Sequence, residues 1–165
     1  MRQTNGFSLL ELMVVLAVIF ILLAIAIRGM REMMIHANEA SAVASIRAIN
    51  TSEVSYQATY GGYAESLGQL GGSEPCTKSA ETACLLDESL AGGEKSGYHF
   101  VAAGGNVSGG RNATYLASAV PDAFGKTGTR IFCSTDRGVI RVDQNAERST
   151  TPPSAEQCVA FPALK

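Results

Sequence analysis

The chain has 165 residues and a mass of 17.3 kDa, which is enough for one domain of ordinary size with an appendage. It is 46% hydrophobic and 17% charged, with a formal net charge of -2, so it lacks both the basic excess typical of nucleic-acid binding and the composition of a disordered chain. The composition therefore disfavours nucleic acid as a partner and indicates a folded protein whose apolar residues are concentrated at its start.

The first predicted element is an apolar helix over residues 7–27, in which Ser8 and Glu11 are the polar exceptions. At about 1.5 Å per residue the helix is roughly 30 Å long, the thickness of a bilayer core. The stretch is longer than the apolar core of about 7–15 residues in a secretory signal peptide, and Arg28-Gly29 follows it instead of a small-x-small cleavage site. It is therefore a candidate transmembrane segment that is not cleaved at its end.

Glu11 does not fit a plain membrane anchor. A carboxylate inside the hydrocarbon costs about 2.5–3.5 kcal/mol on insertion scales, and such groups usually have a partner or a function. Alternatively, Glu11 lies close enough to the helix end to reach the headgroups, where the positive end of the helix dipole also favours it. The residues alone leave both explanations open.

The stretch "GFSLLELMVVLAVIFILLAIAI" resembles the N-terminal signature of type IV pilins and the related pseudopilins. The resemblance covers roughly the first fifth of the chain. It implies a leader peptide over residues 1–6, cleavage between Gly6 and Phe7 by a prepilin peptidase, and N-methylation of Phe7. It also implies that Glu11 pairs with the amino terminus of a neighbouring subunit and so sets the axial register of assembly.

From this resemblance we expect a structural subunit with no enzymatic activity. The precursor lies in the bacterial inner membrane and then assembles, with the pilus assembly machinery, into an extracellular homo-oligomeric helical filament, a type IV pilus. One alternative within the family is a pseudopilin of a type II secretion system. A different class is an uncleaved, membrane-anchored binding module, in which Phe7 never becomes the amino terminus.

The helix is predicted to continue through residues 28–60, because no proline interrupts this segment and helix-forming residues dominate it. One face carries an apolar stripe, which makes this half amphipathic: Ile35, Ala42, Ile46, Ile49, Tyr56 and Tyr60. Gly61-Gly62 is expected to end the helix. The stripe predicts that a domain packs on this half.

Residues 61–165 are predicted to form a globular head. A Gly/Ser/Thr-rich loop with a short helix at Leu85–Ala91 comes first, and four strand candidates follow: Tyr98–Ala103, Tyr115–Val120, Arg130–Ser134 and Gly138–Val142. The tail from Ala146 is expected to be irregular until Cys158. The predicted fold class is α+β: a long N-terminal α-helix packed against a small antiparallel β-sheet of three to four strands, as in pilins.

The four cysteines, Cys76, Cys84, Cys133 and Cys158, all follow the apolar segment, where a membrane-tethered chain places its exported part. An even number there indicates two disulfides formed in an oxidising compartment. Of the three possible pairings we favour the sequential one, Cys76 with Cys84 and Cys133 with Cys158. A metal site is disfavoured, because there is no Cys-x-x-Cys pair and both histidines lie far from the cysteines in sequence.

No catalytic motif is apparent around His36 or His99, and we expect no cofactor. Four arginines near the C-terminus suggest a basic patch of the kind that DNA uptake requires. Acidic residues are interleaved with them, so a mixed-charge surface is the better prediction. The arginines are Arg130, Arg137, Arg141 and Arg148.

Overall fold

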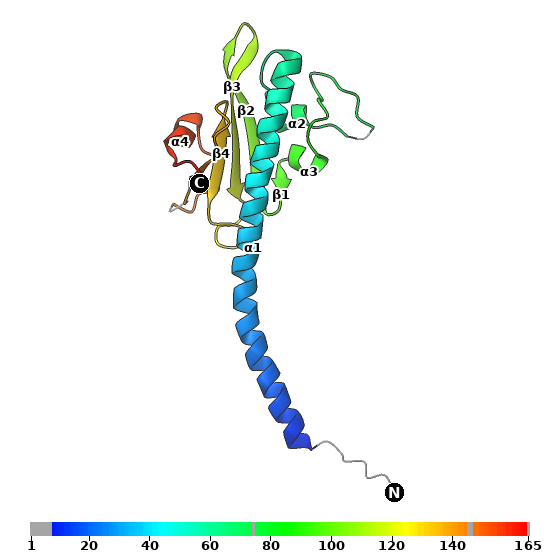
Figure 1. Cartoon of the computed structure of the whole chain (residues 1–165), viewed down its shortest axis with the longest axis vertical. Helices are drawn as coiled ribbons and strands as arrows, with labels where there is room; N and C mark the ends of the chain where they lie inside the picture. The colour runs from blue at the N-terminus through cyan, green and yellow to red at the C-terminus, as the bar shows by residue number, and fades with distance from the viewer. Residues whose placement is uncertain (1–7, 74, 145–146, 165) are drawn as a thin grey trace. The chain divides into compact units, whose positions relative to one another are not determined.

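The computed structural model describes residues 8–73, 75–144 and 147–164, without the side chains of residues 26–28. The chain divides into two compact units, Met1–Met34 and Ile35–Lys165. Figure 1 shows the order of the elements along the chain. They are α1 (Leu9–Tyr60), α2 (Leu67–Leu70), α3 (Glu88–Ala91), β1 (Glu94–Lys95), β2 (Tyr98–Ser108), β3 (Arg111–Pro121), β4 (Ile131–Thr135), β5 (Arg141–Asp143) and α4 (Ala155–Ala160).

Helix α1 confirms the expected continuous helix from the apolar stretch to Tyr60, although Phe7 lies outside the described residues. The predicted stop at Gly61 is also confirmed. Gly61 adopts a φ of 81°, a left-handed conformation that glycine tolerates without steric cost, and its N–H donates to the carbonyl of Gln57 at 2.8 Å. The glycine thus satisfies one of the carbonyls left free at the helix end.

The sheet is an antiparallel meander with strand order β1-β2-β3-β4-β5. This corrects the expected count of three to four strands to five. Strand β1 was missed because it is only two polar residues long, and it pairs with β2 through a turn in which Ser96 and Gly97 both have positive φ. The short helix was also predicted too long, since it begins at Glu88 and not at Leu85.

Strands β2 and β3 are longer than the sequence indicated. The glycines after Ala103 suggested a break, but β2 continues to Ser108, and Gly109-Gly110, both with positive φ, form the two-residue turn into Arg111. Strand β2 extends beyond its predicted end because a two-residue turn of this kind keeps both strands paired up to the turn itself.

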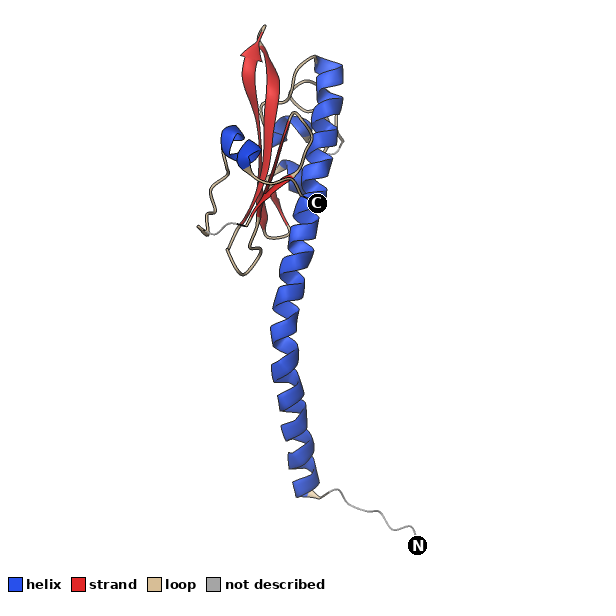
Figure 2. Cartoon of the chain, turned by 60° about the vertical axis from the view of Figure 1, so that its left-hand side comes forward, coloured by secondary structure: helices blue, strands red, loops and turns tan. Residues whose placement is uncertain are grey.

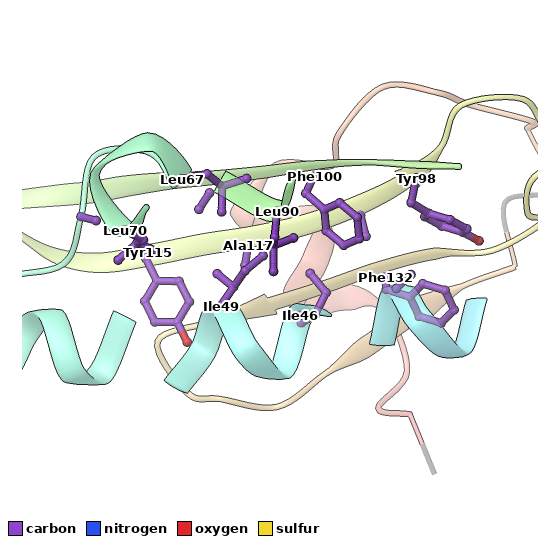
Figure 3. Packing of buried hydrophobic residues seen from close by; sticks show 14 of the residues in the cluster. Ile46, Ile49, Leu67, Leu70, Leu90, Tyr98, Phe100, Tyr115, Ala117 and Phe132 are labelled. Carbon is purple, nitrogen blue, oxygen red and sulfur yellow. The ribbon is translucent and has the colours of Figure 1, made fainter. Parts of the chain in front are cut away.

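The core of the second unit lies between the residues of α1 after Ile35 and one face of the sheet, as Figure 3 shows for the labelled side chains. Ala42, Ile46 and Ile49 of the predicted stripe are fully buried, and Tyr56 is 7% exposed. This part of the helix therefore forms one compact unit with residues 61–165. The apolar stripe on α1 packs against large side chains from the sheet, principally Tyr98, Phe100 and Phe132.

The other face of the sheet is covered in part by α4, so that the sheet lies between α1 and α4 in the views of Figures 1 and 2. All five residues of β4 are buried, as expected for a strand covered on both faces. The tail was expected to be irregular until Cys158, and this is wrong from Ala155 onward, where α4 begins. Ser154 caps this helix by accepting from the N–H of Gln157, and the Gln157 side chain accepts from the N–H of Ser154.

Both disulfides have the sequential pairing that the sequence analysis favoured. Cys76 pairs with Cys84 and closes the loop after α2, with the Cα atoms 6.1 Å apart. Cys133 of β4 pairs with Cys158 of α4, with the Cα atoms 5.9 Å apart, and both residues are fully buried. The second bond ties the C-terminal helix to the centre of the sheet.

Removing the Cys133–Cys158 bond is expected to destabilise the protein more than removing Cys76–Cys84. The loop-entropy relation gives about 3.5 kcal/mol for the longer loop and about 2.5 kcal/mol for the shorter one. Loss of the Cys133–Cys158 bond also leaves packing defects in the core. Urea unfolding of Cys133→Ala/Cys158→Ala and of the matched control Cys76→Ala/Cys84→Ala, each as the full chain in detergent, measures the difference. Equal destabilisation by the two double substitutions, or a larger effect of Cys76→Ala/Cys84→Ala, would contradict the prediction.

Candidate functional site

The first feature of functional interest is the apolar surface of α1 between Leu9 and Ile25. Every side chain in this range is exposed, and the large apolar ones are between 45% and 76% exposed. Monomeric soluble proteins rarely expose contiguous apolar patches larger than a few hundred Å². Lipid or other protein chains must therefore cover this surface.

Its length and composition suit a bilayer. Among the described residues, α1 is the one helix long and apolar enough to cross a membrane, and its most apolar window has a mean hydropathy of 3.1. A helix satisfies its own backbone hydrogen bonds, so it can enter hydrocarbon without unpaired polar groups. The apolar stretch ends before Arg28, and the part of α1 from Ile35 onward belongs to the second compact unit.

Glu11 lies in the first turn of α1 and its side chain is exposed on the apolar surface. The turn is closed by the N–H of Leu12, which donates to the carbonyl of Ser8 at 3.2 Å. None of the ion pairs between described residues includes Glu11. The position near the helix N-terminus favours a negative charge. Gly6 and Phe7 lie outside the described residues, so the geometry of the cleavage site is not described.

The unit Ile35–Lys165 contains a buried charge on α1 that was not predicted from the sequence. Glu39 is 1% exposed, and it accepts hydrogen bonds from Nε and Nη2 of Arg130 at 2.9 and 2.6 Å. It also accepts from the N–H and the hydroxyl of Thr129, at 3.0 and 2.8 Å. Glu39 thereby ties α1 to the segment that leads into β4.

A sequence signal for this pair existed. The stripe positions on α1 are three, four or seven residues apart, and Glu39 falls on the stripe, four residues after Ile35 and three before Ala42. A carboxylate on an otherwise apolar helix face predicts a buried partner, because an unpaired buried charge is costly. Glu53 occupies the equivalent place between Ile49 and Tyr56.

Two of the four C-terminal arginines serve internal contacts. Arg130 pairs with Glu39, and Nη1 of Arg141 donates to the carbonyl of Phe161 at 2.7 Å. A third, Arg148, lies over the ring of Phe124. Among the described residues there is no group of three or more His, Cys, Asp or Glu side chains that could hold a metal ion.

Comparison with known proteins identifies the N-terminal segment. A family model for the prokaryotic N-terminal methylation motif matches residues 1–27. This range contains Gly6, Phe7 and Glu11 together with the apolar stretch. No curated protein and no solved structure matches the chain.

The chain thus carries the class III signal of the type IV pilins and pseudopilins, as the sequence resemblance indicated. Its α+β architecture, a long N-terminal helix packed with an antiparallel sheet, is pilin-like. Together these findings support a precursor of the pilin and pseudopilin class, anchored in a membrane by its apolar helix.

Proposed function

We propose that the protein is a structural pilin subunit that assembles into an extracellular type IV pilus. The observation that carries the proposal is the methylation motif over residues 1–27, which lies on a helix whose apolar surface is exposed on all sides. Such a surface can be covered by lipid before assembly and by other copies of the helix afterwards. The role is structural, and the proposal assigns no enzymatic activity to the chain.

The proposal divides the chain by role. Residues 1–6 are the leader, residues 7–27 the transmembrane and assembly helix, and residues 28–60 its amphipathic continuation. Residues 61–165 form the head with its disulfide-bonded loop and tail. Prepilin peptidase cleaves between Gly6 and Phe7, Phe7 is N-methylated, and the pilus assembly machinery transfers the subunit from the inner membrane to the cell surface.

Glu11 sets the axial register of the subunits in this proposal. Cleavage leaves a positively charged amino group on Phe7, and the Glu11 carboxylate of one subunit pairs with that group on its neighbour. A charge in apolar surroundings loses its hydration, and an opposite charge close by compensates for part of this cost. The compensation is available only when a second subunit is present, so assembly and charge pairing occur together.

The test is the N-terminal sequence and the mass of the mature protein recovered from a sheared surface fraction. We expect a chain that begins at Phe7 and is one methyl group heavier than the unmodified sequence. Abundant recovery from that fraction supports a pilus, whereas the same processing without surface filaments favours a secretion pseudopilin. A chain that still begins at Met1 and stays in the membrane would overturn the proposal and favour an uncleaved binding module.

A second prediction concerns the cleavage site. Gly6→Leu is expected to abolish leader removal, because the family signal places a glycine immediately before the cut. The uncleaved chain should accumulate in the membrane and be absent from the surface fraction. The control is Gly29→Leu, which replaces a glycine within α1 at a position where an added Cβ meets open space. Normal processing of Gly6→Leu would remove Gly6 from the proposed site.

A further inference from the structure

Unlike Glu39, a second buried carboxylate of α1, that of Glu53, has no charged partner among the described residues. Glu53 is completely buried, and its Oε2 accepts the N–H of Ala64 at 3.0 Å. Its Oε1 is buried and has no hydrogen-bond partner, and it is the one such side-chain atom among the described residues. None of the ion pairs between described residues includes Glu53. A buried carboxylate without a charged partner lowers the stability of the fold if it is ionised.

The hydrogen bond from Ala64 attaches a particular piece of chain to α1. Residues 61–66, called the crossing segment here, leave the end of α1 and pass onto the sheet. Tyr63 donates its N–H to the carbonyl of Asn112 at 3.0 Å and accepts from Nδ2 of Asn112 at 3.2 Å, while Ser66 forms a β-bridge with Ala103. The crossing segment therefore joins α1 to both long strands, and Glu53 holds its helix side.

The surroundings of Glu53 favour the neutral acid. Burial raises the pKa of Glu53 to about 7, and the hydrogen bond from Ala64 offsets only part of this effect. The titratable groups that interact with it are the tyrosines Tyr56 on α1, Tyr63 on the crossing segment and Tyr115 on β3. None of them is a cation, so none stabilises the carboxylate by charge.

Charged groups interact with these tyrosines or lie at the crossing segment. Glu65 on the crossing segment is exposed, and Asp136, after β4, interacts with Tyr63 and Tyr115. Both add negative charge to this end of the head. The guanidinium of Arg111 lies against Gly61 at the start of the crossing segment, and its side chain is exposed to solvent. Burial, and none of these charged groups, raises the pKa of Glu53.

We propose that Glu53 is a proton-controlled latch that keeps the crossing segment attached to α1 while the carboxyl is neutral and loosens it when the carboxyl ionises. In the neutral form Oε1 carries the proton and Oε2 accepts from Ala64. Ionisation places an uncompensated charge in the core, and the local structure then opens to hydrate it. An exported head experiences the pH of its surroundings, so the latch responds to pH changes near neutrality.

The test uses the full chain in detergent micelles and two NMR observables. The first is the carboxyl carbon of Glu53, which we expect to titrate at about 7. The second is the amide exchange rate of Ala64, corrected for the intrinsic pH dependence of exchange. Between about pH 5 and about pH 8 the protection of the Ala64 amide should fall by about tenfold or more as Glu53 ionises.

Glu53→Gln is the decisive variant, because the amide keeps the size of the acid and an oxygen for Ala64 but cannot ionise. Protection of the Ala64 amide in this variant should be independent of pH after the same correction. The control Glu94→Gln removes an exposed carboxylate from β1 and should behave as the wild type. Titration of the Glu53 carboxyl at its ordinary pKa, or the same loss of protection in Glu53→Gln, would overturn the proposal. The carboxyl titration in the wild type decides the question even if Glu53→Gln does not fold.

Discussion

Glu11→Leu is expected to abolish filament assembly while the protein remains membrane-inserted. The substitution makes the apolar segment more hydrophobic, so insertion is retained or improved. In the proposed filament, however, the charged amino terminus of a neighbouring subunit loses its partner in an apolar environment. Leaving one member of a buried ion pair unpaired costs about 3 kcal/mol or more, which corresponds to at least about a 100-fold weaker contact per subunit.

The measurement compares the amount of protein in sheared surface and membrane fractions, with the processing state read by mass. Glu32→Gln is the matched control, because Glu32 is an exposed glutamate on the same helix that lies beyond the apolar stretch. It should assemble normally. Normal filaments from Glu11→Leu would mean that Glu11 does not set the register. Loss of methylation in the variant would instead show that Glu11 acts in processing.

Glu39→Ala should lower the free energy of unfolding of the head by about 3 kcal/mol. The value is taken from the low end of the range for breaking a buried ion pair, because Arg130 is 32% exposed and can recover part of its hydration. The substitution also removes the acceptor for the N–H and hydroxyl of Thr129. Urea unfolding of the full chain in detergent, followed by the near-ultraviolet signal of the tyrosines, measures the change.

The control for this experiment is Glu94→Ala, which removes an exposed glutamate from β1 and should change stability by less than about 0.5 kcal/mol. A change in Glu39→Ala as small as that of the control would contradict the prediction. Arg130→Met provides a second check. It should also be destabilising, because it leaves Glu39 as a buried carboxylate with only Thr129 as its donor.

The two buried glutamates give opposite pH dependences. Burial tends to raise the pKa of Glu39, but hydrogen bonds from Arg130 and Thr129 and the charge of Arg130 outweigh it and hold the pKa below its ordinary value of 4.5. The stability that Glu39 contributes is therefore present above 4.5 and is lost as the pH falls through its lowered pKa. The pKa of Glu53 is raised, so its contribution is present below 4.5 and is lost as the pH rises through about 7.

We therefore expect the wild-type head to be most stable in mildly acidic solution. In Glu39→Gln the fall in stability at low pH that Glu39 causes should be absent. In Glu53→Gln the fall in stability towards neutral pH should be absent. Urea unfolding midpoints at a series of pH values distinguish the two effects. A wild-type profile that is flat from mildly acidic to neutral pH would contradict the assignment to Glu53.

Much of the architecture could be predicted because it depends on local features of the chain. An apolar stretch of this length specifies a helix that needs lipid or other helices around it. The stop at Gly61 follows from the backbone freedom of glycine, and the sequential disulfides follow from short loops between nearby cysteines. The methylation motif is likewise contained within one continuous segment.

The parts that were missed or wrong depend on partners outside the short segment in which each part lies. Strand β1 is a strand only because β2 lies beside it, and the tail helix around Cys158 is held by its bond to β4. Glu39 and Glu53 occupy the same apolar stripe, at positions that the sequence makes equivalent. Their partners come from residues 129–130 in one case and residue 64 in the other.

By itself the sequence determined the apolar helix, its Glu11, the processing signal and the α+β class, because periodicity, length and composition act within short stretches of chain. Only the tertiary structure decided which of the two carboxyl groups has a lowered pKa and which has a raised one. Glu39 faces the guanidinium of Arg130, whereas Glu53 faces a single backbone N–H and tyrosine rings. The ionisation of a buried acid depends on the groups that folding places around it, and these groups are adjacent only in three dimensions.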